Sequence, residues 1–224
     1  MTHPVLQLVY ITDTNMTSVP EGLLSATPPV AFYDLEISGT NLSAIPDTVE
    51  VAWAQLRYLF VERAPQISTF PEVIGRLPNL GVVSLASDSI TSIPDSALTD
   101  NTFFQLMLTN NPINVLPASV GRLSIMRTLG CLSTNISELP AAWLEQNSTP
   151  GAEGLREDSR IVLQAFETPL CRDWLPLAIQ NGQAIVRAAD AADVGWFRVR
   201  CSRGSPPYHY PLDQELQLRE RNRE

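Results

Sequence analysis

The chain contains no lysine, so all 15 of its basic residues are arginine. They are outnumbered by 24 Asp and Glu, which gives a net charge of -9 at pH 7. Residues 1–140 carry 12 acidic residues against 5 Arg, and the remainder carries 12 against 10, so most of the negative charge lies in the first part. Binding of nucleic acid depends on cationic neutralisation of phosphates. This charge therefore disfavours nucleic acid as a partner.

Other absences exclude a membrane span and most chemistry. No apolar run approaches the roughly 18 residues that span a bilayer, and the opening MTHPVLQLVY has neither the basic start nor the apolar core of a signal peptide. The two histidines, His3 and His209, lie near opposite ends and give no plausible catalytic triad. No metal-binding motif or Gly-rich phosphate loop is present. We therefore expect no metal, no cofactor and no enzymatic activity.

What the chain does contain is a repeat, most regular in residues 102–119. There, TFFQLMLTNNPINVLPAS places apolar residues and one asparagine at the spacing L-x-x-L-x-L-x-x-N-x-L-x-x-L-P. Six copies occur, with 26, 25, 23, 23 and 23 residues between their closing prolines. The third copy needs one extra residue around Pro65. The closing prolines are Pro20, Pro46, Pro71, Pro94, Pro117 and Pro140.

Over residues 5–149 this spacing resembles that of the leucine-rich-repeat family, in particular its cell-surface, receptor-like members with a C-terminal cysteine cap. The resemblance implies an α/β fold, a right-handed solenoid with a curved parallel β-sheet on its concave face and short helical or irregular segments on its convex face. It implies six repeats in residues 1–149, a final strand and cap in 150–201, and a charged tail in 202–224. Because terminal repeats normally need a polar cap, we expect the chain to be a fragment whose leader and N-terminal cap are missing.

One position of each repeat, the ladder position, normally carries Asn, which satisfies backbone groups where the chain leaves the strand. Ala64 has no side chain that can do this, so we expect the third repeat to be irregular. Cys131 falls on the inward set of apolar positions, and we expect it to be buried. The ladder residues are Thr14, Thr40, Ala64, Asp88, Asn111 and Thr134.

Template positions three and five point away from the core, because side chains alternate along a strand. In the first three repeats these positions are aromatic and acidic, and in the later repeats they are small and neutral. Aromatic residues beside charges are typical of protein-binding hot spots, so we predict a protein or peptide ligand on this concave face. The predicted contact residues are Tyr10, Tyr33, Asp34, Glu36, Tyr58, Phe60, Glu62 and Met107.

The periodicity stops after Leu144, and a different pattern follows. The segment ETPLC resembles the N-P-L-C entry to the C-terminal cap of cell-surface repeats, with Thr168 in place of Asn. With Cys131 in the core, the cap would be closed by a disulfide between Cys171 and Cys201. Residues 173–182 and 183–193 each suit a short helix, and residues 196–204 alternate as a strand.

A remote alternative is an enzyme. Cys171-Arg172-Asp173 matches the C-x-D motif that supplies the nucleophile in certain bacterial leucine-rich-repeat ubiquitin ligases. Those ligases carry a large helical catalytic domain after the repeats, whereas only about fifty residues follow Cys171 here. We therefore expect no catalytic residue.

The setting of the chain is predicted from its sequons and its cap. Potential N-glycosylation sites are Asn15, Asn41, Asn135 and Asn147. The first three share one template slot, so duplication of the repeat also explains them. Together with the cap cysteines they favour an extracellular or cell-surface ectodomain, whose membrane anchor would lie outside this chain. The alternative is a cytoplasmic scaffold in signalling, favoured by the outer segments PEVIGRL and PASVGRL and by the absent signal peptide.

Overall fold

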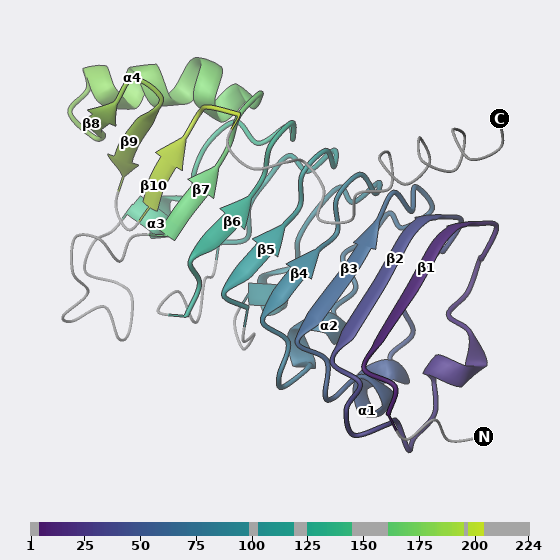
Figure 1. Cartoon of the computed structure of the whole chain (residues 1–224). Helices are drawn as coiled ribbons and strands as arrows, with labels where there is room; N and C mark the ends of the chain where they lie inside the picture. The colour runs from purple at the N-terminus through teal and green to yellow at the C-terminus, as the bar shows by residue number, and fades with distance from the viewer. Residues whose placement is uncertain (1–4, 99–102, 119–124, 145–160, 195–196, 204–224) are drawn as a thin grey trace, which may run out of the picture.

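The computed structural model describes residues 5–98, 103–118, 125–144, 161–194 and 197–203, and its strands form one ten-stranded sheet (Figure 1). The first seven strands are parallel and adjacent in chain order. They are β1 (Leu8–Thr14), β2 (Asp34–Thr40), β3 (Tyr58–Glu62), β4 (Val82–Ser84), β5 (Gln105–Met107), β6 (Thr128–Gly130) and β7 (Ile161–Gln164). We call the turn of chain that contains each of these strands a coil, numbered 1 to 7.

The strands pair at equivalent template positions, as the repeat spacing predicts. Position three reads, from β1 to β7, Leu8, Asp34, Tyr58, Val82, Gln105, Thr128 and Val162. The extra residue of coil 3 leaves this register intact because it lies beyond the strand. It forms a turn in which the N–H of Ile67 donates to the carbonyl of Ala64 at 2.9 Å.

The inward positions of successive coils form a continuous apolar core. The position-four residues are Leu35, Leu59, Val83, Leu106, Leu129 and Leu163, all 0 % exposed. Burial of one aliphatic side chain contributes about 1.5–3 kcal/mol, so this stack contributes substantially to stability. Cys131 is buried within it, as predicted. In coil 1, by contrast, Leu6, Val9 and Ile11 are only partly buried.

Every coil leaves its strand through one residue in the left-handed backbone region. These residues are Asp13, Gly39, Arg63, Ser87, Asn110, Ser133 and Glu167, with φ between 52° and 67°. Each directly precedes the ladder residue. Because Glu167 adopts the same conformation, Thr168 is the ladder residue of coil 7, and the final strand ends as the repeats do.

The ladder residue Asn111 joins two coils. Its side-chain Nδ2 donates to the carbonyl of Leu85 in coil 4 at 2.6 Å and to that of Leu108 in its own coil at 3.0 Å. Its Oδ1 accepts a hydrogen bond from the N–H of Ile90 at 3.0 Å. One side-chain amide thus satisfies backbone groups of both coil 4 and coil 5.

Threonine at the ladder position makes a smaller set of bonds. The hydroxyl of Thr134 donates to the carbonyl of Cys131 at 2.8 Å, and that of Thr168 donates to the carbonyl of Ala165 at 2.6 Å. Both bonds stay within one coil. Threonine therefore closes the turn, while asparagine also connects neighbouring coils.

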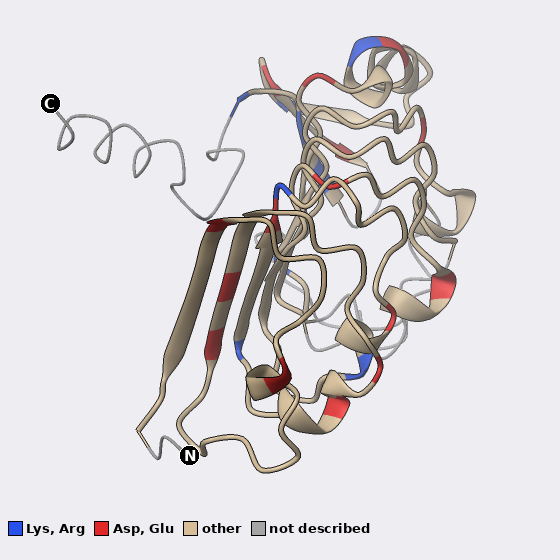
Figure 2. Ribbon diagram, turned by 90° about the vertical axis from the view of Figure 1, so that its right-hand side faces the viewer, with Lys and Arg blue, Asp and Glu red and all other residues tan. Residues whose placement is uncertain are grey.

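Short helical segments lie on the other side of the core from the strands (Figure 2). They are η1 (Glu21–Leu23), α1 (Val49–Ala52), α2 (Val73–Arg76), η2 (Asp95–Leu98) and α3 (Ala141–Leu144). Trp53, directly after α1, is fully buried and donates its ring N–H to the carbonyl of Leu23 at 2.9 Å. Within the described ranges, no helix is long and apolar enough to cross a bilayer.

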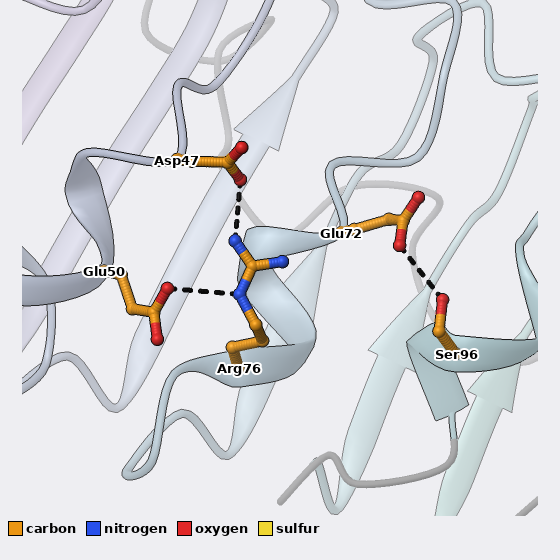
Figure 3. A network of polar contacts seen from close by, with 5 residues as sticks. All are labelled: Asp47, Glu50, Glu72, Arg76 and Ser96. Atoms are coloured by element: carbon orange, nitrogen blue, oxygen red, sulfur yellow. Dashed lines mark hydrogen bonds and ion pairs between the residues drawn. The ribbon is translucent and has the colours of Figure 1, made fainter.

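Polar contacts tie the outer segments of coils 2, 3 and 4 together (Figure 3). Arg76 donates from Nη2 to Asp47 at 2.6 Å and from Nε to Glu50 at 3.1 Å. Glu72, at the start of α2, accepts a hydrogen bond from the hydroxyl of Ser96 at 3.1 Å. The side chains of Arg76, Asp47 and Glu50 are 43 %, 83 % and 50 % exposed, so solvent screens this network.

We expect Arg76→Ala to leave the midpoint of urea unfolding nearly unchanged, because exposed ion pairs contribute little to stability. Urea denaturation at low and high salt measures this. Arg76→Met, which keeps the aliphatic stem, is the matched control. A large loss of stability that disappears in high salt would contradict the expectation.

The C-terminal cap contains a helix where one was predicted, and strands where a second helix was predicted. The five-residue η4 (Leu170–Trp174) continues into α4 (Leu175–Gln180), and the chain turns at Gly182 with φ of 71°. The helix predicted for residues 183–193 is wrong, because β8 (Ile185–Ala188) and β9 (Ala191–Val194) form an antiparallel hairpin there. Strand β10 (Phe197–Arg200) was predicted, and it pairs with both β7 and β9.

Pairing with β10 overrides the helical preference of the alanine-rich segment. It buries Ala192 and Val194 in the core. It also places the buried Asp193 between two guanidinium groups, with Arg187 at 2.6 Å and Arg198 at 2.9 Å. A helix would offer neither the strand pairing nor this charge compensation.

Two contacts fasten the cap to coil 7 and coil 6. Cys171 and Cys201 form the predicted disulfide, with their Cα atoms 5.6 Å apart. The rings of Trp143 and Phe197 stack with centroids 4.7 Å apart, which joins α3 to β10. The C-terminal end of the solenoid is therefore covered and crosslinked.

Candidate partner-binding face

Strands β1, β2 and β3 present two rows of side chains on their solvent side, which we call the concave face. In one row Asp34 lies between Leu8 and Tyr58, and in the other Glu36 lies between Tyr10 and Phe60. Neighbouring strands are about 4.8 Å apart, so each carboxyl group is flanked on both sides by apolar or aromatic surface. This arrangement follows directly from the parallel register.

Two tyrosines and one leucine of this face are accessible to solvent. Tyr10 is 51 % exposed, Leu8 is 39 % exposed and Tyr58 is 38 % exposed. The rings of Tyr33 and Tyr58 meet edge to face, with centroids 6.3 Å apart. The contact fixes Tyr58 on coil 3 against the residue that precedes β2.

The two carboxyl groups on β2 are held in an unfavourable environment for charge. Burial, together with the nearby carboxyl groups of Asp34 and Glu62, raises the pKa of Glu36 to about 7. Burial also raises the pKa of Asp34, whose Oδ1 is buried and has no hydrogen-bond partner. A cation placed against β2 would relieve both effects.

Two of the predicted contact residues are not accessible. Glu62 is 0 % exposed and accepts a hydrogen bond from the hydroxyl of Ser84 on the neighbouring strand. Met107 is 2 % exposed, because it packs against Gly130, where any side chain would collide with it. The aromatic and acidic part of the concave face therefore ends at β3, with Phe60 partly buried at its border.

A polar hollow of about 470 Å³ lies at the carboxyl ends of β1, β2 and β3. Sequence reasoning missed it, although the template placed its lining residues in equivalent slots of three coils. The lining residues are Asp13, Thr14, Asn15, Gly39, Thr40, Asn41, Arg63 and Pro65.

Three of the predicted glycosylation sites are exposed at this same edge of the sheet. Asn15, Asn41 and Asn135 each follow a ladder residue and face solvent. The side chain of Asn41 donates to that of Asn15 at 3.4 Å. Asn147 lies outside the described residues. Glycosylation stays a prediction at all four positions.

The C-x-D motif gains no support from its geometry. The sulfur of Cys171 is in the disulfide, and a nucleophilic cysteine must be a free thiolate. Arg172 and Asp173 form an ion pair with each other at 2.7 Å. Cys171 therefore crosslinks the cap and is not available as a nucleophile.

Comparison with known proteins bears on the fold. No family model and no curated protein matches the chain. A leucine-rich-repeat protein of Leptospira interrogans is similar over 74 % of this chain and 44 % of its own length, at 19 % identity and a TM-score of 0.54. The leucine-rich-repeat domain of a Shigella effector is similar over 89 % of this chain and 83 % of its own length, at 18 % identity and a TM-score of 0.50. The chain thus spans less than half of the Leptospira protein.

The parallel register, the ladder bonds and these two likenesses agree. The chain has the fold of the leucine-rich-repeat proteins, as its repeat spacing predicts.

Proposed function

We propose that the chain is a non-enzymatic recognition module that binds a protein or peptide partner on the concave face of β1, β2 and β3. The alternation of carboxyl and aromatic side chains across these strands carries the proposal. Solenoid repeats use their concave surface for binding. Parallel strands hold these side chains in place before a partner arrives, so little ordering entropy is lost on docking.

The charge of the face indicates the chemistry of the partner. Asp34 and Glu36 lie on one strand of a chain with a net charge of -9. The flanking rings of Tyr10, Tyr58 and Phe60 offer surfaces on which the stem of Arg or Lys packs and its cation is attracted. We infer a partner segment that presents a basic side chain to β2.

For the setting, we propose the ectodomain of a receptor-like or secreted protein. Disulfides such as Cys171–Cys201 persist in oxidising compartments, and Asn15, Asn41 and Asn135 are exposed. The cytoplasmic scaffold is the competing setting. Intact mass after secretory expression separates the two, with and without reductant and glycosidase. A reducible bridge and removable glycan support the ectodomain, whereas free thiols and bare sequons on folded protein support the scaffold.

Binding can be tested with a displayed library of random peptides selected on the intact chain. We expect the enriched peptides to carry Arg or Lys, and the double variant Asp34→Asn, Glu36→Gln to bind them at least about tenfold more weakly, a loss of about 1.4 kcal/mol. Wild-type affinity should rise as the pH passes upward through about 7, because the cation binds the ionised form of Glu36. Glu36→Gln alone should remove that rise.

Two further variants control for folding and for the position of the site. Tyr58→Ser with Phe60→Ser, which removes both rings without adding charge, should weaken binding strongly while the strand-rich circular dichroism spectrum is kept, because both side chains point off the core. Thr128→Asp, at position three of coil 6, should leave binding unchanged. Peptides without basic residues, or affinity that the β2 variants do not alter, would contradict the proposed site.

A further inference from the structure

The joint between coils 3 and 4 contains a buried carboxyl group. Ala64 cannot form ladder bonds with its side chain, as the sequence predicted, and its N–H donates instead to Oδ1 of Asp88 at 2.8 Å. Asp88 is 6 % exposed. Its second oxygen, Oδ2, is buried and has no hydrogen-bond partner. Coil 4 thus has a carboxyl group where the template places an amide.

Coil 5 shows what an amide does at this position. Asn111 accepts one backbone N–H and also donates to the carbonyls of Leu85 and Leu108. By position in the repeat, the corresponding carbonyls of coils 3 and 4 are those of Val61 and Leu85. A carboxylate only accepts hydrogen bonds, whereas a protonated carboxyl group has one O–H to donate. This position therefore favours the protonated form of Asp88, which can donate one hydrogen bond.

The charged groups that adjoin this joint are of both signs. Coil 3 contributes Glu62, which is itself buried, and Arg63, whose guanidinium donates to the hydroxyl of Ser38 at 3.4 Å. The described residues of coil 5, 103–118, include no charged side chain. Burial, opposed by the hydrogen bond from the N–H of Ala64 and assisted by the charge of Glu62, raises the pKa of Asp88 to about 8.

We propose that Asp88 keeps its proton in the folded solenoid at neutral pH and acts as an acid-stabilised latch between coils 3 and 4, so that this joint weakens as the pH rises. An unfolded Asp titrates near 3.9. Between about pH 4 and pH 8 the folded chain then holds one more proton at Asp88 than the unfolded chain does. Stability conferred by the latch is complete below this window and is lost as the pH rises through it.

The titration of Asp88 can be observed directly. In the full chain labelled with ¹³C-aspartate, the carboxyl resonance of Asp88 is assigned by its absence in Asp88→Asn. We expect its midpoint well above pH 6, about two or more units above that of an ordinary Asp. A midpoint near 4 would overturn the proposal.

Stability gives an independent test, because Asp88→Asn restores the amide that functions in coil 5 and should fold. Between pH 5 and pH 8 the Tm of the wild type should fall by at least about 5 °C more than that of Asp88→Asn. Glu36 contributes to the pH dependence of both proteins, so the difference isolates Asp88. Asp190→Asn, in the exposed turn between β8 and β9, should behave like the wild type.

Hydrogen exchange of the backbone amides tests whether the pH effect occurs at the joint between coils 3 and 4. The protection factor of the Ala64 N–H should fall about tenfold per pH unit across this window in the wild type, because opening of the joint releases a proton. In Asp88→Asn it should be nearly constant. Equal pH dependence in the two proteins, for Tm or for Ala64 protection, would show that no such latch exists.

Discussion

Leu108→Asp is expected to abolish the cooperative unfolding of the solenoid. Leu108 is 0 % exposed and lies in the core between coils 4 and 6. Loss of a buried Leu side chain alone costs about 2–5 kcal/mol, and burial of a carboxylate without a partner adds several more. The total approaches the whole stability of a typical domain, about 5–15 kcal/mol. Urea unfolding followed by circular dichroism measures the effect.

The matched control for this variant is Val115→Asp. Val115 belongs to the same coil but is 68 % exposed, so the same new charge remains in water. We expect its unfolding free energy to lie within about 0.5 kcal/mol of the wild type. If Leu108→Asp folded as stably as Val115→Asp, the inward register assigned to coil 5 would be wrong.

Removal of the disulfide is expected to have the second largest effect. Cys171 and Cys201 are separated by 30 residues, and closure of a loop of that length restricts the unfolded chain by about 3 to 4 kcal/mol. The double variant Cys171→Ser, Cys201→Ser should therefore lose about that much stability, which corresponds to a Tm lower by roughly 10 °C.

Reductant provides the internal control for this prediction. Reduced wild type should match the double variant, and reductant should not change the Tm of the variant, because its remaining cysteine, Cys131, is buried outside the bridge. A variant that keeps its full Tm would mean that the cap is held by packing, such as the stack of Trp143 on Phe197, and not by the bridge.

The repeat spacing predicted the strands and their register because the same positions must be buried in every coil. Leu59, Val83 and Leu106 could be aligned from the sequence alone, and the structure pairs them as aligned. The disulfide could be anticipated too, since Cys131 belongs to the apolar set. Local spacing is sufficient where each coil meets only its neighbours.

The remaining features depend on contacts that spacing does not encode. The alternation of side chains along each strand predicted that Glu62 and Met107 lie on the solvent side of the sheet. Their burial there depends on the small neighbours Ser84 and Gly130. The segment 183–193 has alanine-rich helical composition and forms strands because β10 offers an edge to pair with.

Asp88 illustrates a third limit of sequence reasoning. The template identified it as a ladder residue, and its bond to the backbone of the preceding coil could be expected. Its burial and the orphaned second oxygen, on which the state of its proton depends, are properties of the assembled coils.

Coil 1, at one end of the proposed binding face, is expected to unfold locally before the other coils because its core is only partly buried. Leu6, Val9 and Ile11 lose less solvent contact than their counterparts in later coils, whereas the opposite end carries the disulfide and the aromatic stack. In a chain of nearest-neighbour units, opening begins at the unit with the weakest interface. A partner that spans β1, β2 and β3 would hold coil 1 against coils 2 and 3, so its affinity would include the free energy of ordering that end.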